Sequence, residues 1–209
     1  MNSPKSPRFK LLVVCTANEC RSVIGHEAFE RSHIGDLISV SSAGSSAHEG
    51  TARCKETLSD AIHVNHLSTH IDSVNLAHFD AIFTMEKMHS SSVASRNPAS
   101  RNITFTLPQA ATLVQLLAES LTGKRQDFVP EIPSSWDALN AVGRLQWLIS
   151  EMNEARSYAT FLTEEIPDAH GRNAATHKFA LDSVEESVNT VTSIAAEILA
   201  LNFGTTTGS

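Results

Sequence analysis

Cys15 and Arg21 stand six residues apart in the stretch VCTANECRS, where an apolar run ends and a helical pattern begins. A phosphate group needs several N–H donors and a positive charge, and the start of a helix supplies donors at the favourable end of its dipole. The backbone after Cys15 can therefore wrap a phosphate, while the planar guanidinium of Arg21 binds two oxygens. The same groups favour the thiolate of Cys15, which would attack phosphorus from below.

The other residues of this stretch suit the same purpose. The Ser22 hydroxyl can stabilise a thiolate by a hydrogen bond, and Asn18 suits a turn with positive φ. The spacing of cysteine and arginine alone is weak, because it arises often by chance. Its position between a predicted strand and a predicted helix, with Ser22 directly after Arg21, strengthens it. The predicted phosphate-binding residues are Thr16, Ala17, Asn18, Glu19, Cys20, Arg21 and Ser22.

Short apolar runs alternate with helical patterns through the first half of the chain. FKLLVVC, LISVSSAG, FDAIFTM and ITFT are typical of strands, and RSVIGHEAFERSH and TARCKETLSDAI are typical of helices. This alternation predicts an α/β fold: an open, four-stranded parallel sheet with helices on both faces. Ligands bind beyond the carboxyl ends of the strands in such sheets, and Cys15 lies at one such end.

The second half of the chain has a helical texture. A helix is expected after Pro108 up to Gly123, followed by an extended connector with two prolines. SSWD has the form of a capping box, and an apolar stripe from Ala138 to Met152 follows it. A last helix is expected over 174–201. We expect one domain over 9–203, with a flexible N-terminus at 1–8 and a disordered tail at 204–209.

The composition of the chain disfavours several classes of function. The net charge is −7 and no run of Lys and Arg is present, which disfavours a nucleic-acid or membrane-surface binder. The apolar run near the N-terminus is too short for a signal peptide, so a cytoplasmic location is expected. Three cysteines do not predict a disulfide framework, and their spacing from the histidines predicts no metal site. Cys54, expected on a helix face without a partner, is interpreted as inert.

The motifs together resemble the low-molecular-weight protein tyrosine phosphatases of bacterial type. The family's loop reads Cys, any, Gly, Asn, any, Cys, Arg, Ser, which Cys15, Asn18, Cys20, Arg21 and Ser22 match. SSAG at 41–44 resembles the family's turn after the second strand, and FDAIFTMEKMH resembles its third strand. EIPDAHG resembles the loop that carries the general-acid aspartate, which is here Asp168.

The resemblance implies a mechanism. Cys15 attacks phosphorus, Asp168 protonates the leaving phenolic oxygen and later activates water, and Arg21 binds the phosphate oxygens. No cofactor is required. Cys20 would act as a redox guard that traps oxidised Cys15 as a disulfide. The implied substrate is a phosphorylated protein, with a tyrosine kinase as one candidate, and residues 109–163 are interpreted as a helical insertion.

The sequence also departs from the family pattern. Ala17 replaces the loop glycine, Val23 replaces a proline, and Ala169 and His170 follow Asp168 where the family has proline and aromatics. The aromatic walls around a phosphotyrosine ring are therefore not evident, although His170 offers one face. Asp168 also suits a plain turn after a proline, in which case Glu164 or Glu165 would replace it as the acid.

Three other functions stay open at this stage. Thr16 directly follows the nucleophile, as in family members that act on phosphoarginine, so a protein arginine phosphatase is one alternative. A thiol-coupled arsenate reductase is a second, in a version that uses Cys15 and an external small thiol, because only Cys54 follows Cys20. A non-catalytic phosphate-binding module is the third.

Overall fold

The computed structural model describes residues 7–57, 61–160, 165–169 and 171–202. The predicted flexible N-terminus and tail lie largely outside these ranges. The predicted four-stranded parallel sheet is confirmed, and the structure shows its strand order to be β2-β1-β3-β4. The strands are β1 (Phe9–Cys15), β2 (Ile38–Gly44), β3 (Ala81–Thr84) and β4 (Thr104–Thr106).

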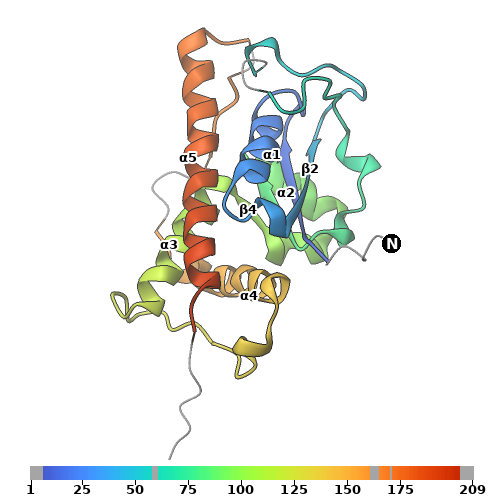
Figure 1. Cartoon of the computed structure of the whole chain (residues 1–209). Helices are drawn as coiled ribbons and strands as arrows, with labels where there is room; N and C mark the ends of the chain where they lie inside the picture. Colours follow the sequence, from blue (N-terminus) through green and yellow to red (C-terminus); the bar gives the residue numbers. More distant parts are fainter. Residues whose placement is uncertain (1–6, 58–60, 161–164, 170, 203–209) are drawn as a thin grey trace, which may run out of the picture.

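Five α-helices are described, joined in part by short 3-10 turns. Figure 1 shows α5 running along one side of the molecule beside α1 and α3, with α4 below them. None of the helices in the described ranges has both the length and the apolar character needed to cross a membrane. The helices are α1 (Arg21–Arg31), α2 (Lys87–Arg96), α3 (Leu107–Leu121), α4 (Ala141–Glu154) and α5 (Ala174–Leu199).

Apolar residues of β1 alternate between the two faces of the sheet, and each face has its own core. Leu11 and Val13 join a large core with α1, α3, α4 and α5. Leu12 and Val14 face a smaller core that includes Val93 of α2 and the 3-10 turns Ile71–Ser73 and Leu76–His78. The sheet is therefore covered on both faces, which is why every described residue of β1 except Lys10 is buried.

Gly25 explains how α1 approaches the sheet so closely. A Cβ atom at this position would lie 3.1 Å from Cγ1 of Val13 and 3.5 Å from Cγ1 of Val184. Glycine has a low helix propensity, but its lack of a side chain allows α1 to pack closely against both β1 and α5. The start of α1 is thereby held against the carboxyl end of β1.

The predicted helix over 51–62 is wrong for the residues that the structure describes. Only a 3-10 turn, Lys55–Thr57, is present there; Leu58 lies outside the described residues, and Ile62 is exposed. Contacts with residues distant in sequence hold the described part of this segment in a non-helical conformation. The buried side chains of Arg53 and Glu27 form an ion pair with 2.6 Å between Nη1 and Oε1.

The capping box predicted at SSWD is also wrong. Trp136–Ala138 form a 3-10 turn, and α4 begins only at Ala141, where Oδ1 of Asn140 accepts from the Gly143 amide at 2.9 Å. Trp136 is buried, and its indole nitrogen donates to the Leu201 carbonyl at 2.8 Å. This anchoring fixes Trp136 outside the helix.

The helical segment after β4 joins the main core. α3 begins with a capping box between Thr106 and Gln109, and the predicted last helix is confirmed as α5. Leu145, Ile149 and Met152 of the predicted stripe are buried in the same core as α3 and α5. The interpretation of 109–163 as an insertion, within one domain over 9–203, stays a prediction.

Candidate active site

Cys15 is the last residue of β1, at the carboxyl edge of the sheet, and α1 begins six residues later. The residue is buried, and its sulfur lies 3.0 Å from the Ser22 hydroxyl oxygen. The backbone amide of Asn18 donates to the same sulfur, with 3.3 Å between N and Sγ. The Asn18 amide and the Ser22 hydroxyl therefore both contact the sulfur, an arrangement that suits a nucleophilic cysteine.

Asn18 fixes the shape of loop 15–22. Its φ is +57°, so the expected positive-φ turn is confirmed. The Asn18 side chain donates to the Ser22 hydroxyl at 2.9 Å and accepts from the Thr69 amide at 2.9 Å. Its carbonyl oxygen lies 2.9 Å from Nε2 of His66. This buried residue thus connects the loop to the chain before the turn Ile71–Ser73.

The segment after β2 supports the loop from the side. The Ser45 and Ser46 amides donate to the carbonyls of Cys15 and Thr16, both at 2.9 Å. A Cβ atom on Gly44 would lie 2.6 Å from the Thr16 carbonyl oxygen, so only glycine allows this approach. The Ser-Ala-Gly turn is therefore a structural support of the loop.

The guanidinium of Arg21 faces the loop and is buried. Nη1 contacts the Glu86 carboxylate and donates to the Ile166 carbonyl at 2.8 Å. Nη2 donates to the Thr16 hydroxyl at 3.2 Å and lies 3.1 Å from Oδ2 of Asp168. None of the hydrogen bonds that Arg21 makes to described residues uses Nε. The arginine is held in one orientation by two carboxylates.

Asp168 reaches this site from far along the chain. The Ile166 amide donates to the Met85 carbonyl at 2.8 Å, which attaches its segment to the end of β3. The Asp168 side chain is 46% exposed, while Ala169 packs into the main core. The structure therefore brings Cys15, Arg21 and Asp168 to one edge of the sheet. A half-exposed carboxylate beside Arg21 can exchange protons with a leaving group or water.

Glu164 and Glu165 are the alternatives to Asp168 as general acid. Oε1 of Glu165 accepts from the Lys87 amide at 2.9 Å, at the start of α2. Glu164 lies outside the described residues, as does His170, which was considered as a wall for an aromatic ring.

Glu86 and His89 belong to the site, and the sequence interpretation missed both. The Glu86 amide donates to Nδ1 of His89 at 3.1 Å, so Nε2 carries the proton and donates to the Thr16 hydroxyl at 3.0 Å. Burial, with the positive charge of Arg21, lowers the pKa of His89 to about 4. One signal was available: both residues follow β3 at the carboxyl edge of the sheet.

The Cys20 thiol lies close to the Cys54 thiol. The Cys54 sulfur lies 3.3 Å from Nε2 of His177, near the start of α5. Burial and the neighbouring Cys54 raise the pKa of the Cys20 thiol. The expectation that Cys54 lies on a helix face without a partner is therefore wrong. The role of Cys20 as a redox guard for Cys15 stays a prediction.

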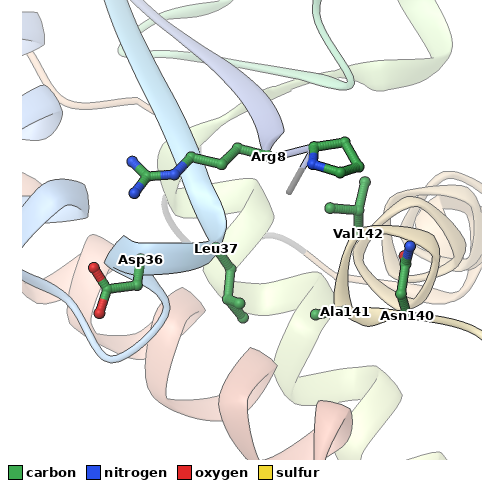
Figure 2. A pocket seen from close by; sticks show the side chains of 7 residues that line it. Arg8, Asp36, Leu37, Asn140, Ala141 and Val142 are labelled. Carbon is green, nitrogen blue, oxygen red and sulfur yellow. The ribbon is translucent and has the colours of Figure 1, made fainter. Parts of the chain in front are cut away.

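A pocket at the other end of the sheet lacks such chemistry. It has a volume of about 380 Å³, and Figure 2 shows Arg8, Leu37, Asn140 and Val142 among its lining residues. Arg8 precedes β1 and Leu37 precedes β2, so the pocket lies beyond the amino ends of these strands. No cysteine or histidine lines it.

Comparison with known proteins agrees with this geometry. Residues 10–112 match the family model of the low molecular weight phosphotyrosine protein phosphatases. No curated protein sequence matches the chain. The arginine phosphatase YwlE from Geobacillus stearothermophilus is a similar solved structure, with 18% identity, 88% of this chain and 91% of that chain covered, and a TM-score of 0.55.

Two further structures are tyrosine phosphatases. Wzb from Escherichia coli K30, in complex with phosphate, has 21% identity, covers 92% of this chain and 99% of its own, and has a TM-score of 0.55. A protein tyrosine phosphatase from Entamoeba histolytica has 18% identity, covers 90% and 97%, and has a TM-score of 0.57. At these identities the likeness shows a shared fold, with the expected α/β architecture.

Proposed function

We propose that the chain, whose residues 10–112 match the family model of the low molecular weight phosphotyrosine protein phosphatases, is a phosphatase of this family and hydrolyses protein phosphotyrosine through a phosphocysteine intermediate. Cys15 is the proposed nucleophile and Asp168 the proposed general acid and base. We further propose a cytoplasmic location and, among phosphorylated proteins, a tyrosine kinase as substrate, as the family resemblance implies.

One observation carries this proposal. The Cys15 sulfur accepts from the Asn18 amide and lies against the Ser22 hydroxyl, below a loop that continues directly into α1. A thiolate in this position would accept hydrogen bonds from both groups, and the first amides of α1 would direct positive potential toward a bound phosphate. The arrangement supports nucleophilic attack more directly than simple phosphate binding, which needs no ionised sulfur.

The proposed reaction has two steps. The Cys15 thiolate attacks phosphorus, the bond from phosphorus to the tyrosyl oxygen breaks, and Asp168 gives its proton to the departing oxygen. Asp168, now a carboxylate, takes a proton from water as the water oxygen attacks phosphocysteine, which releases phosphate and restores the thiolate. Arg21 and the loop amides bind the phosphoryl oxygens in both transition states.

A rapid acid quench with radiolabelled p-nitrophenyl phosphate tests the nucleophile. Nitrophenolate leaves easily, so the second step limits turnover and phosphocysteine accumulates in the wild type. We expect up to one label per chain, in a peptide that contains Cys15, and no turnover with Cys15→Ser. Turnover by Cys15→Ser, or label on another residue, would refute the mechanism. Cys54→Ser is the matched control and should be labelled like the wild type.

Phosphoarginine is a second candidate substrate, supported by two observations. Ala169 follows Asp168 and is buried, so it forms no wall for an aromatic ring. Thr16 follows the nucleophile, although its hydroxyl already contacts His89 and Arg21, and one of the similar folds is an arginine phosphatase. Comparing kcat/KM on a phosphotyrosine and a phosphoarginine peptide of one sequence separates the two candidates. A preference for phosphoarginine would overturn the tyrosine assignment and leave the cysteine mechanism in place.

A further inference from the structure

We propose that Cys20, Cys54 and His177 form a binding site for a thiophilic metal cation, with Zn²⁺ as its simplest occupant. The two sulfur atoms and one ring nitrogen of these residues all lie within 4.8 Å of one another. The site shares Cys20 with loop 15–22, but its ligand atoms are the side-chain atoms of these three residues. The proposal does not depend on the proposed function.

The three ligands come from three segments that other contacts already hold together. The Cys54 amide donates to the Glu19 carbonyl at 2.9 Å, which fixes Cys54 beside loop 15–22. His177 lies in the first turns of α5, whose start is capped by Asn173. The Arg53–Glu27 ion pair attaches the neighbouring residue of Cys54 to α1. The ligands therefore need little rearrangement to meet one cation.

The donor set selects the class of metal. Two thiolates and an imidazole suit Zn²⁺ or Cu⁺ and suit Mg²⁺ or Ca²⁺ poorly, since those ions prefer oxygen ligands. In a tetrahedral zinc site with bonds of roughly 2.0–2.3 Å, neighbouring ligand atoms are about 3.5 Å apart. The Cys54 sulfur and Nε2 of His177 are already 3.3 Å apart. Each cysteine that binds the cation releases its thiol proton to solvent.

The site also has an open side. Cys54 is partly exposed, and His177 lines a pocket of about 450 Å³ between α1 and α5 that reaches Thr57. A cation can enter from there, and water can fill the fourth position, as in zinc sites with three protein ligands. A bound cation would connect loop 15–22 with the 51–57 segment and with α5.

Cobalt titration tests the site directly. The full-length protein is treated with a chelator, kept reduced with a phosphine and titrated with Co²⁺ while thiolate-to-cobalt absorption in the near ultraviolet is recorded. We expect one Co²⁺ per chain and its displacement by Zn²⁺. Cys54→Ser should bind Co²⁺ at least about 100-fold more weakly with roughly half the absorption per metal, because one thiolate is lost. His177→Gln should bind more weakly by a similar factor and retain the sulfur absorption.

Two controls make the result decisive. Cys15→Ser should bind Co²⁺ like the wild type, because the Cys15 sulfur is outside the ligand set. Cys54→Ser and His177→Gln should keep wild-type turnover of an aryl phosphate in the presence of chelator, which shows that they fold. Absence of thiolate-to-cobalt absorption in the wild type, unchanged binding by either ligand variant, or loss of binding in Cys15→Ser would overturn the proposal.

Discussion

Arg21 and Asp168, far apart in sequence, form an ion pair with 3.1 Å between Nη2 and Oδ2. The pair places a carboxylate at the edge of loop 15–22, where a leaving group of a bound phosphate ester would emerge. An aspartate that served only to form a turn would not need this contact with Arg21.

Asp168→Asn should slow turnover by an amount that depends on the leaving group. Asparagine cannot donate a proton, so phenyl phosphate, whose leaving oxygen is strongly basic, should lose about 10²–10⁴-fold in kcat/KM. p-Nitrophenyl phosphate needs little protonation and should lose much less. Steady-state kinetics on a series of aryl phosphates measures the trend. Equal losses across the series would remove Asp168 from the role of acid, and Glu165→Gln is the matched control.

Glu86 is predicted to position Arg21. Its carboxylate contacts Nη1 of Arg21, whose side chain is only 4% exposed. Glu86→Ala leaves a buried donor without this partner and lets the guanidinium turn, so kcat/KM should fall at least about 10-fold. Glu86→Gln keeps an acceptor oxygen and should stay within about 3-fold of the wild type. If glutamine is as damaging as alanine, the negative charge itself matters and a positioning role is wrong.

Much of the fold was predictable because local patterns decide it. The short apolar runs of FKLLVVC and its neighbours predict which segments are strands, and the spacing of Val184, Val188 and Val191 predicts the buried face of α5. Parallel pairing then follows from the alternation of strands with helices. These features depend on residues that are close in sequence.

The wrong predictions concern segments whose structure depends on contacts with residues far away in the sequence. Nothing in TARCKETLSDAI shows that Arg53 will pair with Glu27, yet that ion pair and the Cys54 amide hold the segment outside a helix. The same holds for the site. The loop motif could be interpreted by itself. The position of Glu86 and His89 after a predicted strand was one signal, but their contacts with Arg21 and Thr16 depend on the folded chain.

Asn18 offers a way to separate two contributions to the loop's stability. Asn18→Gly and Asn18→Ala both lose the side-chain bonds to Ser22 and Thr69, which should cost about 2 kcal/mol in the free energy of unfolding. Alanine at a φ of +57° should cost about 1 kcal/mol more than glycine. Urea unfolding of the two variants measures the difference. Equal stabilities would mean that the loop relaxes to negative φ.

His89 should make stability depend on pH. Its pKa is lowered to about 4 in the folded chain by burial and by Arg21, with Asp168 opposing, against 6.5 for an ordinary histidine. Below pH 6.5 the unfolded chain therefore binds a proton that the folded chain does not. The stabilisation is complete above pH 6.5 and declines as the pH falls toward 4.

The effect of His89 can be isolated with a variant. Between pH 7.5 and pH 5, the free energy of unfolding of the wild type should fall by about 2 kcal/mol more than that of His89→Gln, which has no ring to protonate. Urea unfolding at both pH values gives the comparison. His33→Gln, a surface control, should follow the wild type. A parallel decline in wild type and His89→Gln would show that His89 is protonated as easily in the folded as in the unfolded chain.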